Sequence, residues 1–192
     1  MRSTWKKTLP AALAAGALAV AGCGGDDPPG ATSKAPGNGV DRAFVAAMIP
    51  HHESAIVMAK IAQRRGESQF VEQLADDIVA SQSREIATMR REDAALDRAG
   101  IEPGTLGVGE HMMGMDDDPR ELSSADPFDR EFIAMMVPHH EGAIEMAKAE
   151  LARGADPELK AIARDIVDAQ QREIAAMGEH VGGSTSHSGH SG

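Results

Sequence analysis

The sequence predicts an all-α protein, a four-helix bundle made of two tandem two-helix repeats. Three observations support this fold class: the composition, a gapless internal repeat and the spacing of the apolar residues. The 192 residues include no Tyr, one Trp and four Phe, and 26% of them are charged. Because aromatic residues favour strands whereas the abundant Ala and Met have high helix propensity, this composition indicates helices.

The internal repeat comprises residues 41–89 and 129–177. The two segments align without a gap at a constant offset of 88 residues, so that Asp41 corresponds to Asp129 and Met89 to Met177. About half of the aligned positions are identical. A repeat of this kind indicates duplication of one supersecondary unit, whose copies bury their apolar faces against each other.

Each repeat contains two predicted amphipathic helices. In each helix one face consists mainly of apolar residues at steps of three and four, with a few polar residues set among them. In the first helix these positions are Phe44, Met48, His51, Ala55 and Met58. In the second helix and its copy they are Val71, Leu74, Ile78, Gln82, Glu85 and Met89, and Leu159, Ile162, Ile166, Gln170, Glu173 and Met177.

Glycine and proline positions predict the limits of the first helix in each repeat. Gly66 and Gly154 are expected to end these helices, since glycine commonly follows a helix C-terminus. Pro50 and Pro138 directly precede a His-His pair. We expect a helix kinked at each proline, rather than a helix that begins there, because the apolar face starts earlier, at Phe44 in the first repeat.

The first residues predict a lipoprotein signal peptide, residues 1–22. A basic start precedes an apolar stretch that is shorter than the roughly 20 residues needed to span a bilayer. The stretch ends in Val20-Ala21-Gly22-Cys23, which resembles the lipobox of bacterial lipoproteins. The alternative is an ordinary signal peptide with a chance cysteine, but Cys23 is the only cysteine of the chain. We therefore expect an extracytoplasmic protein, anchored to the cell membrane by lipidated Cys23.

The segments around the repeats have other compositions. Residues 23–40, rich in Gly and Pro, predict a flexible linker that begins at the lipidated cysteine. Residues 97–125 form a Met-rich connection between the repeats, and residues 182–192 predict a disordered tail that contains two histidines. The four-helix domain is accordingly expected to span residues 41–181.

The charge of the chain limits its partners. The formal net charge is −11, and removal of residues 1–22, which contain three basic and no acidic residues, would bring it to −14. An acidic protein repels nucleic acid phosphates and attracts cations. A nucleic-acid partner is therefore not expected, whereas a metal ion is.

Each repeat carries the pattern Met-x-x-His-His-Glu in its first helix. Met48 and His51 lie three residues apart and therefore share a helix face. A turn near residues 66 and 67 would place Gln82 level with the histidines and Glu85 within one helical turn of them. A carboxylate on an apolar face is unfavourable unless it is paired or bound to a metal, so we expect a metal site here. Glu53, by contrast, is expected to face solvent.

The candidate metal ligands come from both repeats and from the connection. They are Met48, His51, His52, Glu85, Met89, Met136, His139, His140, Glu173, Met177, His111, Met112, Met113 and Met115. The alternative is that histidine–glutamate hydrogen bonds tie each hairpin together without metal while the methionines fill the core. Recurrence of the same Met, His-His and Glu in both repeats favours metal binding.

Copper, and Cu(I) in particular, is the favoured cofactor. Thioether sulfur is a soft ligand that selects Cu(I), and methionines clustered in a polar connection have no core to fill. Outside the cytoplasm cysteine is oxidised, which makes Met and His the durable soft ligands. Iron or manganese is the alternative, because di-iron bundles use Glu-x-x-His motifs. Here Met stands where that Glu would be.

The repeated motif also carries a resemblance to a family. The pattern Phe-x-x-x-Met-x-x-His-His-Glu-x-Ala-x-x-Met-Ala, at residues 44–59 and 132–147, resembles the DUF305 family of secreted bacterial proteins. This resemblance implies a ferritin-like bundle of two similar two-helix repeats, each with a His-His motif. It covers residues 41–178 and suggests copper binding or copper tolerance, in which some members are implicated.

Three functions remain open at this point. The favoured one is a copper-binding module that sequesters Cu(I) at the cell surface or passes it on. A ferritin-like di-metal oxidase is the alternative, although the missing Glu-x-x-His motif speaks against an enzyme. The third is a structural lipoprotein that binds no metal.

Overall fold

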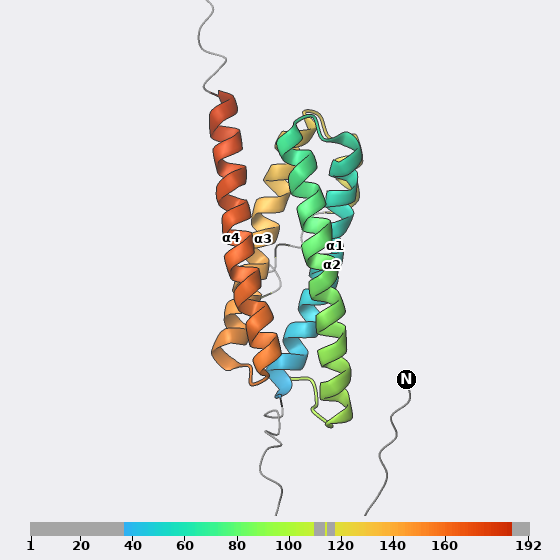
Figure 1. Cartoon of the computed structure of the whole chain (residues 1–192), viewed down its shortest axis with the longest axis vertical. Helices are drawn as coiled ribbons and strands as arrows, with labels where there is room; N and C mark the ends of the chain where they lie inside the picture. Colours follow the sequence, from blue (N-terminus) through green and yellow to red (C-terminus); the bar gives the residue numbers. More distant parts are fainter. Residues whose placement is uncertain (1–36, 110–113, 115–117, 186–192) are drawn as a thin grey trace, which may run out of the picture. The chain divides into compact units, whose positions relative to one another are not determined.

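The computed structural model describes residues 37–109, 114 and 118–185, and no strand occurs in these ranges. The elements are α1 (Gly39–Arg65), α2 (Gln69–Arg98), η2 (Pro119–Ser124), α3 (Phe128–Arg153) and α4 (Pro157–Thr185). The helices α1 and α2 pack as one hairpin, α3 and α4 as a second, and the hairpins meet mainly through α1 and α3 (Figure 1). The predicted all-α fold, a four-helix bundle of two helical hairpins, is confirmed.

Some sequence predictions fall outside the described residues. They concern the signal peptide at residues 1–22, the lipidation site Cys23, most of the linker, the end of the tail, and the connection residues His111, Met112, Met113 and Met115. Within the described part, no helix combines the length and the apolar character needed to cross a lipid bilayer.

The predicted linker ends earlier than expected, because Asn38 caps α1. The side chain of Asn38 accepts hydrogen bonds from the backbone N–H groups of Val40 and Asp41, at 2.8 and 3.3 Å, and the Asp41 carboxylate accepts one from the Asn38 backbone. This reciprocal capping box satisfies N–H groups that a helix start otherwise leaves unpaired. The assignment of residues 37–40 to a flexible linker was therefore wrong.

The predicted disordered tail also begins too early. Helix α4 continues through Gly182 and Gly183 and ends at Thr185, so residues 182–185 are helical. Each glycine costs about 1 kcal/mol relative to alanine inside a helix, which does not stop a long helix whose propagation is already under way.

Both prolines lie inside continuous helices. Pro50 is in the interior of α1 and Pro138 in the interior of α3. The alternative that a helix begins at each proline is therefore wrong, while the kink itself stays a prediction. Gly66 and Gly154 follow the last residues of α1 and α3, as expected.

Two aspartates at equivalent positions fasten the hairpins to each other. The carboxylate of Asp41, at the start of α1, accepts hydrogen bonds from the backbone N–H groups of Ala155 and Asp156 in the α3–α4 turn, at 3.0 and 2.9 Å. The carboxylate of Asp129, at the start of α3, accepts two from the α1–α2 turn, at 2.8 and 2.9 Å. The donors also differ by the repeat offset, so the two hairpins are related by approximate two-fold symmetry.

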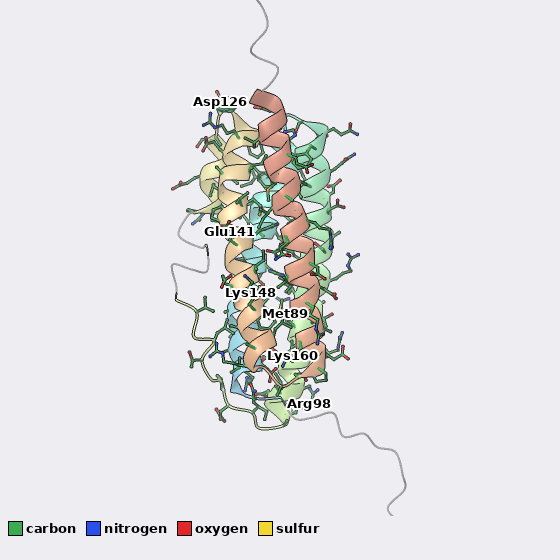
Figure 2. The ribbon with its side chains drawn as sticks, turned by 90° about the vertical axis from the view of Figure 1, so that its left-hand side faces the viewer. Met89, Arg98, Asp126, Glu141, Lys148 and Lys160 are labelled. Atoms are coloured by element: carbon green, nitrogen blue, oxygen red, sulfur yellow. The ribbon has the colours of Figure 1, made fainter. Side chains whose placement is uncertain are left out.

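The hydrophobic core consists of two clusters that the repeat relates to each other. One includes Phe44, Met48, Met89, Met146 and Ile166. The other includes their counterparts Phe132, Met136, Met177, Met58 and Ile78. Each cluster combines residues from the first half of the first helix in one hairpin with residues from the second half of the first helix in the other hairpin. Figure 2 shows the labelled side chains of Glu141 and Lys148, both exposed, on the outside of the bundle.

Candidate metal centre

Between the two hydrophobic clusters lies a layer of buried histidines, which we call the histidine layer: His51 and His52 of α1, and His139 and His140 of α3. His51 and His139 lie against each other where the two helices meet, with ring centroids 3.7 Å apart and ring planes at 37°. All four side chains are buried, with at most 2% of any residue exposed. The structure therefore brings together the histidine pairs of both repeats in one place.

In each hairpin, a glutamate of the second helix contacts the second histidine of the His-His pair. His52 Nε2 lies 2.7 Å from Glu85 Oε2, and His140 Nε2 lies 2.6 Å from Glu173 Oε2. The expected position of these glutamates, within one helical turn of the histidines, is confirmed. A carboxylate that holds one ring nitrogen fixes the orientation of the imidazole, which leaves the other nitrogen available as a ligand atom.

Several polar atoms of this layer have no hydrogen-bond partner among the described residues. They are Nδ1 of His52 and of His140, both ring nitrogens of His139, and Oε1 of Gln82 and of Gln170. Buried polar groups are nearly always paired, because an unpaired one has lost its hydration without compensation. Ring nitrogens without a hydrogen-bond partner occur in both repeats, and such nitrogens are suitable ligands for a metal ion that binds imidazole.

The electrostatics of the layer favour neutral imidazole. Burial, followed by the neighbouring His51, lowers the pKa of His139 to about 2. A neutral ring can lie against another imidazole without charge repulsion, and it is the form of histidine that binds metals.

The four predicted methionines of the helices lie in the core. Met48 and Met89 are fully buried in one hydrophobic cluster, and Met136 and Met177 are fully buried in the other. Met48 and Met136 lie three residues before His51 and His139 and therefore share their helix face. Glu53 and Glu141 are exposed, as expected for Glu53.

The side chains of His, Cys, Asp and Glu residues do not form a complete metal site by themselves in the described part of the chain. Over residues 37–109, 114 and 118–185, no three such side chains gather in a way that could hold a metal ion. A metal bound in the histidine layer would therefore need a further donor, such as thioether sulfur or an amide oxygen, or a small movement of the side chains.

The Met-rich connection touches α3 at the histidine layer. Gly114 has φ +65°, and a Cβ there would overlap the Pro138 carbonyl and lie 2.9 Å from His139 Cα. Only glycine fits this approach without strain. A glycine inside a Met-rich run was the sequence signal for this contact, which sequence reasoning did not use.

The family model described as "Domain of unknown function (DUF305)" matches residues 22–92 and 99–181. The chain belongs to the DUF305 family. The resemblance inferred from the repeated histidine motif is thus confirmed.

Solved structures of DUF305 proteins and of CopM have the same fold. A DUF305 fragment from Deinococcus radiodurans is 34% identical, with a TM-score of 0.63, over 77% of this chain and 98% of the fragment. CopM in its Cu(I)-bound form is 32% identical, with a TM-score of 0.61, over 72% of this chain and 93% of CopM. CopM has also been solved in a Cu(II)-bound form. A secreted DUF305 protein from Streptomyces coelicolor is 27% identical, with a TM-score of 0.61, over 72% of this chain and 89% of that chain.

One curated relative matches over a shorter stretch. The uncharacterised protein L153 of Acanthamoeba polyphaga mimivirus is 43% identical over 49 residues, which are 26% of this DUF305 chain and 32% of the viral protein. The match therefore spans only about a third of that relative.

Sequence reasoning on this DUF305 chain missed a buried acid outside the histidine layer. Glu150 of α3 is fully buried. Burial, followed by the neighbouring Asp41 carboxylate, raises its pKa to about 8. A Cβ on Gly154 would overlap the Glu150 carboxyl group, so the acid is packed against the turn. The first repeat has Ala62 at the equivalent position, and this departure from the repeat was the available signal.

Proposed function

We propose that this protein binds copper in the histidine layer, with preference for Cu(I). The observation that carries the proposal is the contact between His51 and His139, two buried imidazoles that the duplicated hairpins bring together. Each stands next to a further histidine whose Nδ1 has no partner among the described residues. The proposal is also supported by the CopM structures with bound Cu(I) and Cu(II), whose fold this chain shares.

The side chains around the copper would divide into ligands and supports. The ligand atoms would be ring nitrogens of the layer and the thioethers of Met48 and Met136, one helical turn away. Glu85 and Glu173 would act as outer partners that orient His52 and His140. A carboxylate bound to the second nitrogen of a ligating histidine commonly has this role. We therefore place both glutamates behind the ligands rather than on the metal.

Soft donors of the connection would extend the site. Gly114 brings the connection against Pro138 and His139. In the sequence, His111, Met112 and Met113 precede this glycine and Met115 follows it. The methionine thioethers favour Cu(I) over harder metals, and CopM has also been solved in a form with bound silver, another soft ion. The di-metal oxidase gains no support from the carboxylates, since each layer glutamate already pairs with an imidazole.

The biological role would be to sequester copper, or to contribute to copper tolerance, outside the cytoplasm. We place the mature domain on the outer side of the membrane, tethered through lipidated Cys23 and the residues that follow it. The lipobox-like sequence and the fold shared with a secreted Streptomyces protein support this location.

The experiment that tests the copper site is an anaerobic Cu(I) competition titration against a colorimetric chelator. The double variant His51→Leu/His139→Leu should lose the tightest Cu(I) site and keep its helical content, because leucine fills a similar volume. Removing both members of a buried polar pair can even be neutral for stability. His180→Ala, a histidine outside the layer, is the control and should bind as the parent does. Equal affinity in the double variant and the parent would contradict the site.

A further inference from the structure

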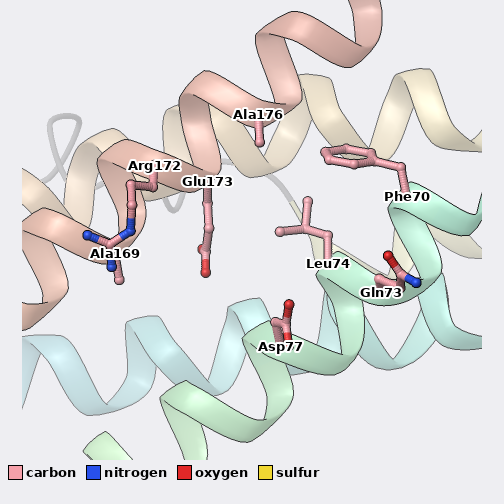
Figure 3. A pocket seen from close by; sticks show the side chains of 8 residues that line it. All are labelled: Phe70, Gln73, Leu74, Asp77, Ala169, Arg172, Glu173 and Ala176. Carbon is pink, nitrogen blue, oxygen red and sulfur yellow. The ribbon is translucent and has the colours of Figure 1, made fainter.

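An open groove lies between α2 and α4, beside one end of the histidine layer. Its volume is about 310 Å³. Side chains from both helices line it, among them Phe70, Leu74, Asp77, Arg172, Glu173 and Ala176. Figure 3 shows Glu173 directed from α4 into the space between the two helices, with Leu74 and Asp77 on the facing helix.

Glu173 belongs both to this groove and to the histidine layer. Its side chain is 20% exposed, and its Oε2 lies 2.6 Å from Nε2 of His140, whose side chain is fully buried. A single side chain therefore connects solvent with a buried imidazole.

Several other sides of the layer are covered by packed groups. The two hydrophobic clusters cover it along the helix axes, above and below. Where α1 and α3 meet, His51 and His139 fill the interface with their own rings. On the side of the connection, Gly114 lies against the backbone of Pro138 and His139. On α2 and α4 the layer reaches solvent through Glu173 and through its repeat counterpart Glu85, whose side chain is 19% exposed, and the groove lies at Glu173.

We propose that this groove is the passage by which a soft monovalent cation, Cu(I), enters and leaves the histidine layer, with Glu173 at its inner end. The inference rests on the proposed copper site and adds its route of exchange. Asp77 and Glu173 supply two negative charges against the one positive charge of Arg172, so the groove attracts a cation. Charged clefts of this kind raise the association rate of oppositely charged ligands.

The duplication provides matched control positions. At the repeat offset, Ala176 corresponds to Thr88 and Asp77 to Asp165. Ala176 and Thr88 are both half-buried, and Asp77 and Asp165 are both exposed. A substitution in the groove can therefore be compared with the same substitution on the equivalent face of the other hairpin.

The first test fills the groove. Ala176→Trp should slow Cu(I) uptake from an acetonitrile complex, followed by anaerobic stopped flow, and should slow copper removal by excess chelator by the same factor. The equilibrium affinity should not change, because the ligands remain in place. Thr88→Trp should exchange copper at the rate of the parent. If Ala176→Trp exchanges copper at the parental rate, or both variants slow equally, the passage is not this groove.

The second test changes charge on an exposed position, where folding is not at risk. Asp77→Lys should lower the uptake rate about tenfold at low salt, and the difference should shrink as salt is added. Asp165→Lys has the same change in net charge and should have a smaller effect. Equal effects of the two substitutions would contradict a passage at Asp77. A parent protein that binds no Cu(I) at equilibrium would instead contradict the proposed function, so the two failures are distinguishable.

Discussion

At the scale of single residues, the centre of this protein depends on buried groups that stay neutral. Burial keeps the His139 imidazole uncharged. Burial, together with the neighbouring Asp41, keeps the Glu150 carboxyl protonated at pH values well above its ordinary pKa. In both cases the charged form would have to leave water without an adequate partner. Neutral imidazole suits metal binding, whereas a protonated carboxylic acid can donate a hydrogen bond to a neighbouring carboxylate.

The methionines next to the histidines provide a test of ligand softness. In Met48→Leu/Met136→Leu, the free energy of unfolding should change by less than about 1.5 kcal/mol at each site, because the swap nearly conserves volume at fully buried positions. Cu(I) affinity should fall clearly, whereas Cu(II), which imidazole also suits, should be less affected. Competition titrations with Cu(I) and Cu(II) chelators measure both effects. Unchanged Cu(I) affinity would mean that these methionines are ordinary core residues.

Glu150 predicts how stability depends on pH. Its pKa is raised from an ordinary value of 4.5 to about 8 in the folded protein, so between these values the folded state holds a proton that the unfolded chain has lost. Its contribution to stability is therefore complete below about pH 4.5 and is lost as the pH rises through about 8. Asp41 and Asp156 oppose its ionisation, and Lys160 favours it.

Urea unfolding of the parent and of Glu150→Gln between about pH 5 and pH 9 checks this dependence. The parent should lose stability with rising pH more steeply than the variant, because glutamine keeps the shape and hydrogen-bonding capacity of the side chain but does not ionise. Identical pH slopes would show that Glu150 is ionised throughout this range in the folded protein.

At the scale of elements, the turns and the connection are held by contacts between distant segments. Asp41 and Asp129, each at the start of a helix, bind the backbone of the other hairpin's turn. A carboxylate that accepts backbone N–H groups makes charge-assisted hydrogen bonds, which are stronger than neutral ones. Gly114 holds the connection against α3 through close backbone packing instead.

Gly114→Ala should separate the connection from the histidine layer. The added Cβ would overlap the Pro138 carbonyl, and the backbone has a positive φ that alanine rarely adopts. We expect a weaker or smaller Cu(I) uptake with little change in the unfolding transition of the bundle. Gly109→Ala is the control in the same connection, since a Cβ there meets nothing within 4 Å. Equal copper binding by the two variants in titrations would contradict a role for this contact.

At the scale of the whole described domain, approximate two-fold symmetry places the histidine layer between two equivalent hydrophobic clusters. Each cluster takes side chains from both hairpins, so neither hairpin can bury its apolar face alone. The layer interrupts this core with polar groups, which is unfavourable for folding unless they are satisfied. A bound metal would both satisfy them and tie the two hairpins together.

The proposed anchor should be separable from the metal site. Cys23→Ala should release the protein from the membrane fraction, because the thiol that would carry the lipid is absent. Its Cu(I) affinity should equal that of the parent, since Cys23 precedes the described domain and lies apart from the layer in the sequence. Cell fractionation and competition titration check the two parts. Loss of copper binding in the released protein would mean that Cys23 is a ligand.

The sequence by itself determined the features that depend on local spacing. The helical hairpins followed from apolar residues at steps of three and four, and their limits from Gly66 and Gly154. The position of Glu85 within one helical turn of the histidines followed from the short turn, which sets the level of one helix against the other, whereas its contact with His52 was seen only in the structure. Even here local rules erred at the ends, at Asn38 and at Gly182, because caps and frayed termini depend on weak and competing contacts.

Only the tertiary structure decided which groups meet across the two repeats. His51 and His139 are 88 residues apart, and Asp41 and Ala155 are still further apart in the sequence. No local periodicity specifies such contacts, because they depend on how the apolar faces of two complete hairpins pack together. The same packing buries Glu150 beside Asp41 and brings Gly114 to the backbone of α3. The sequence thus determined the candidate ligands, and the packing of the hairpins decided which of them face one another.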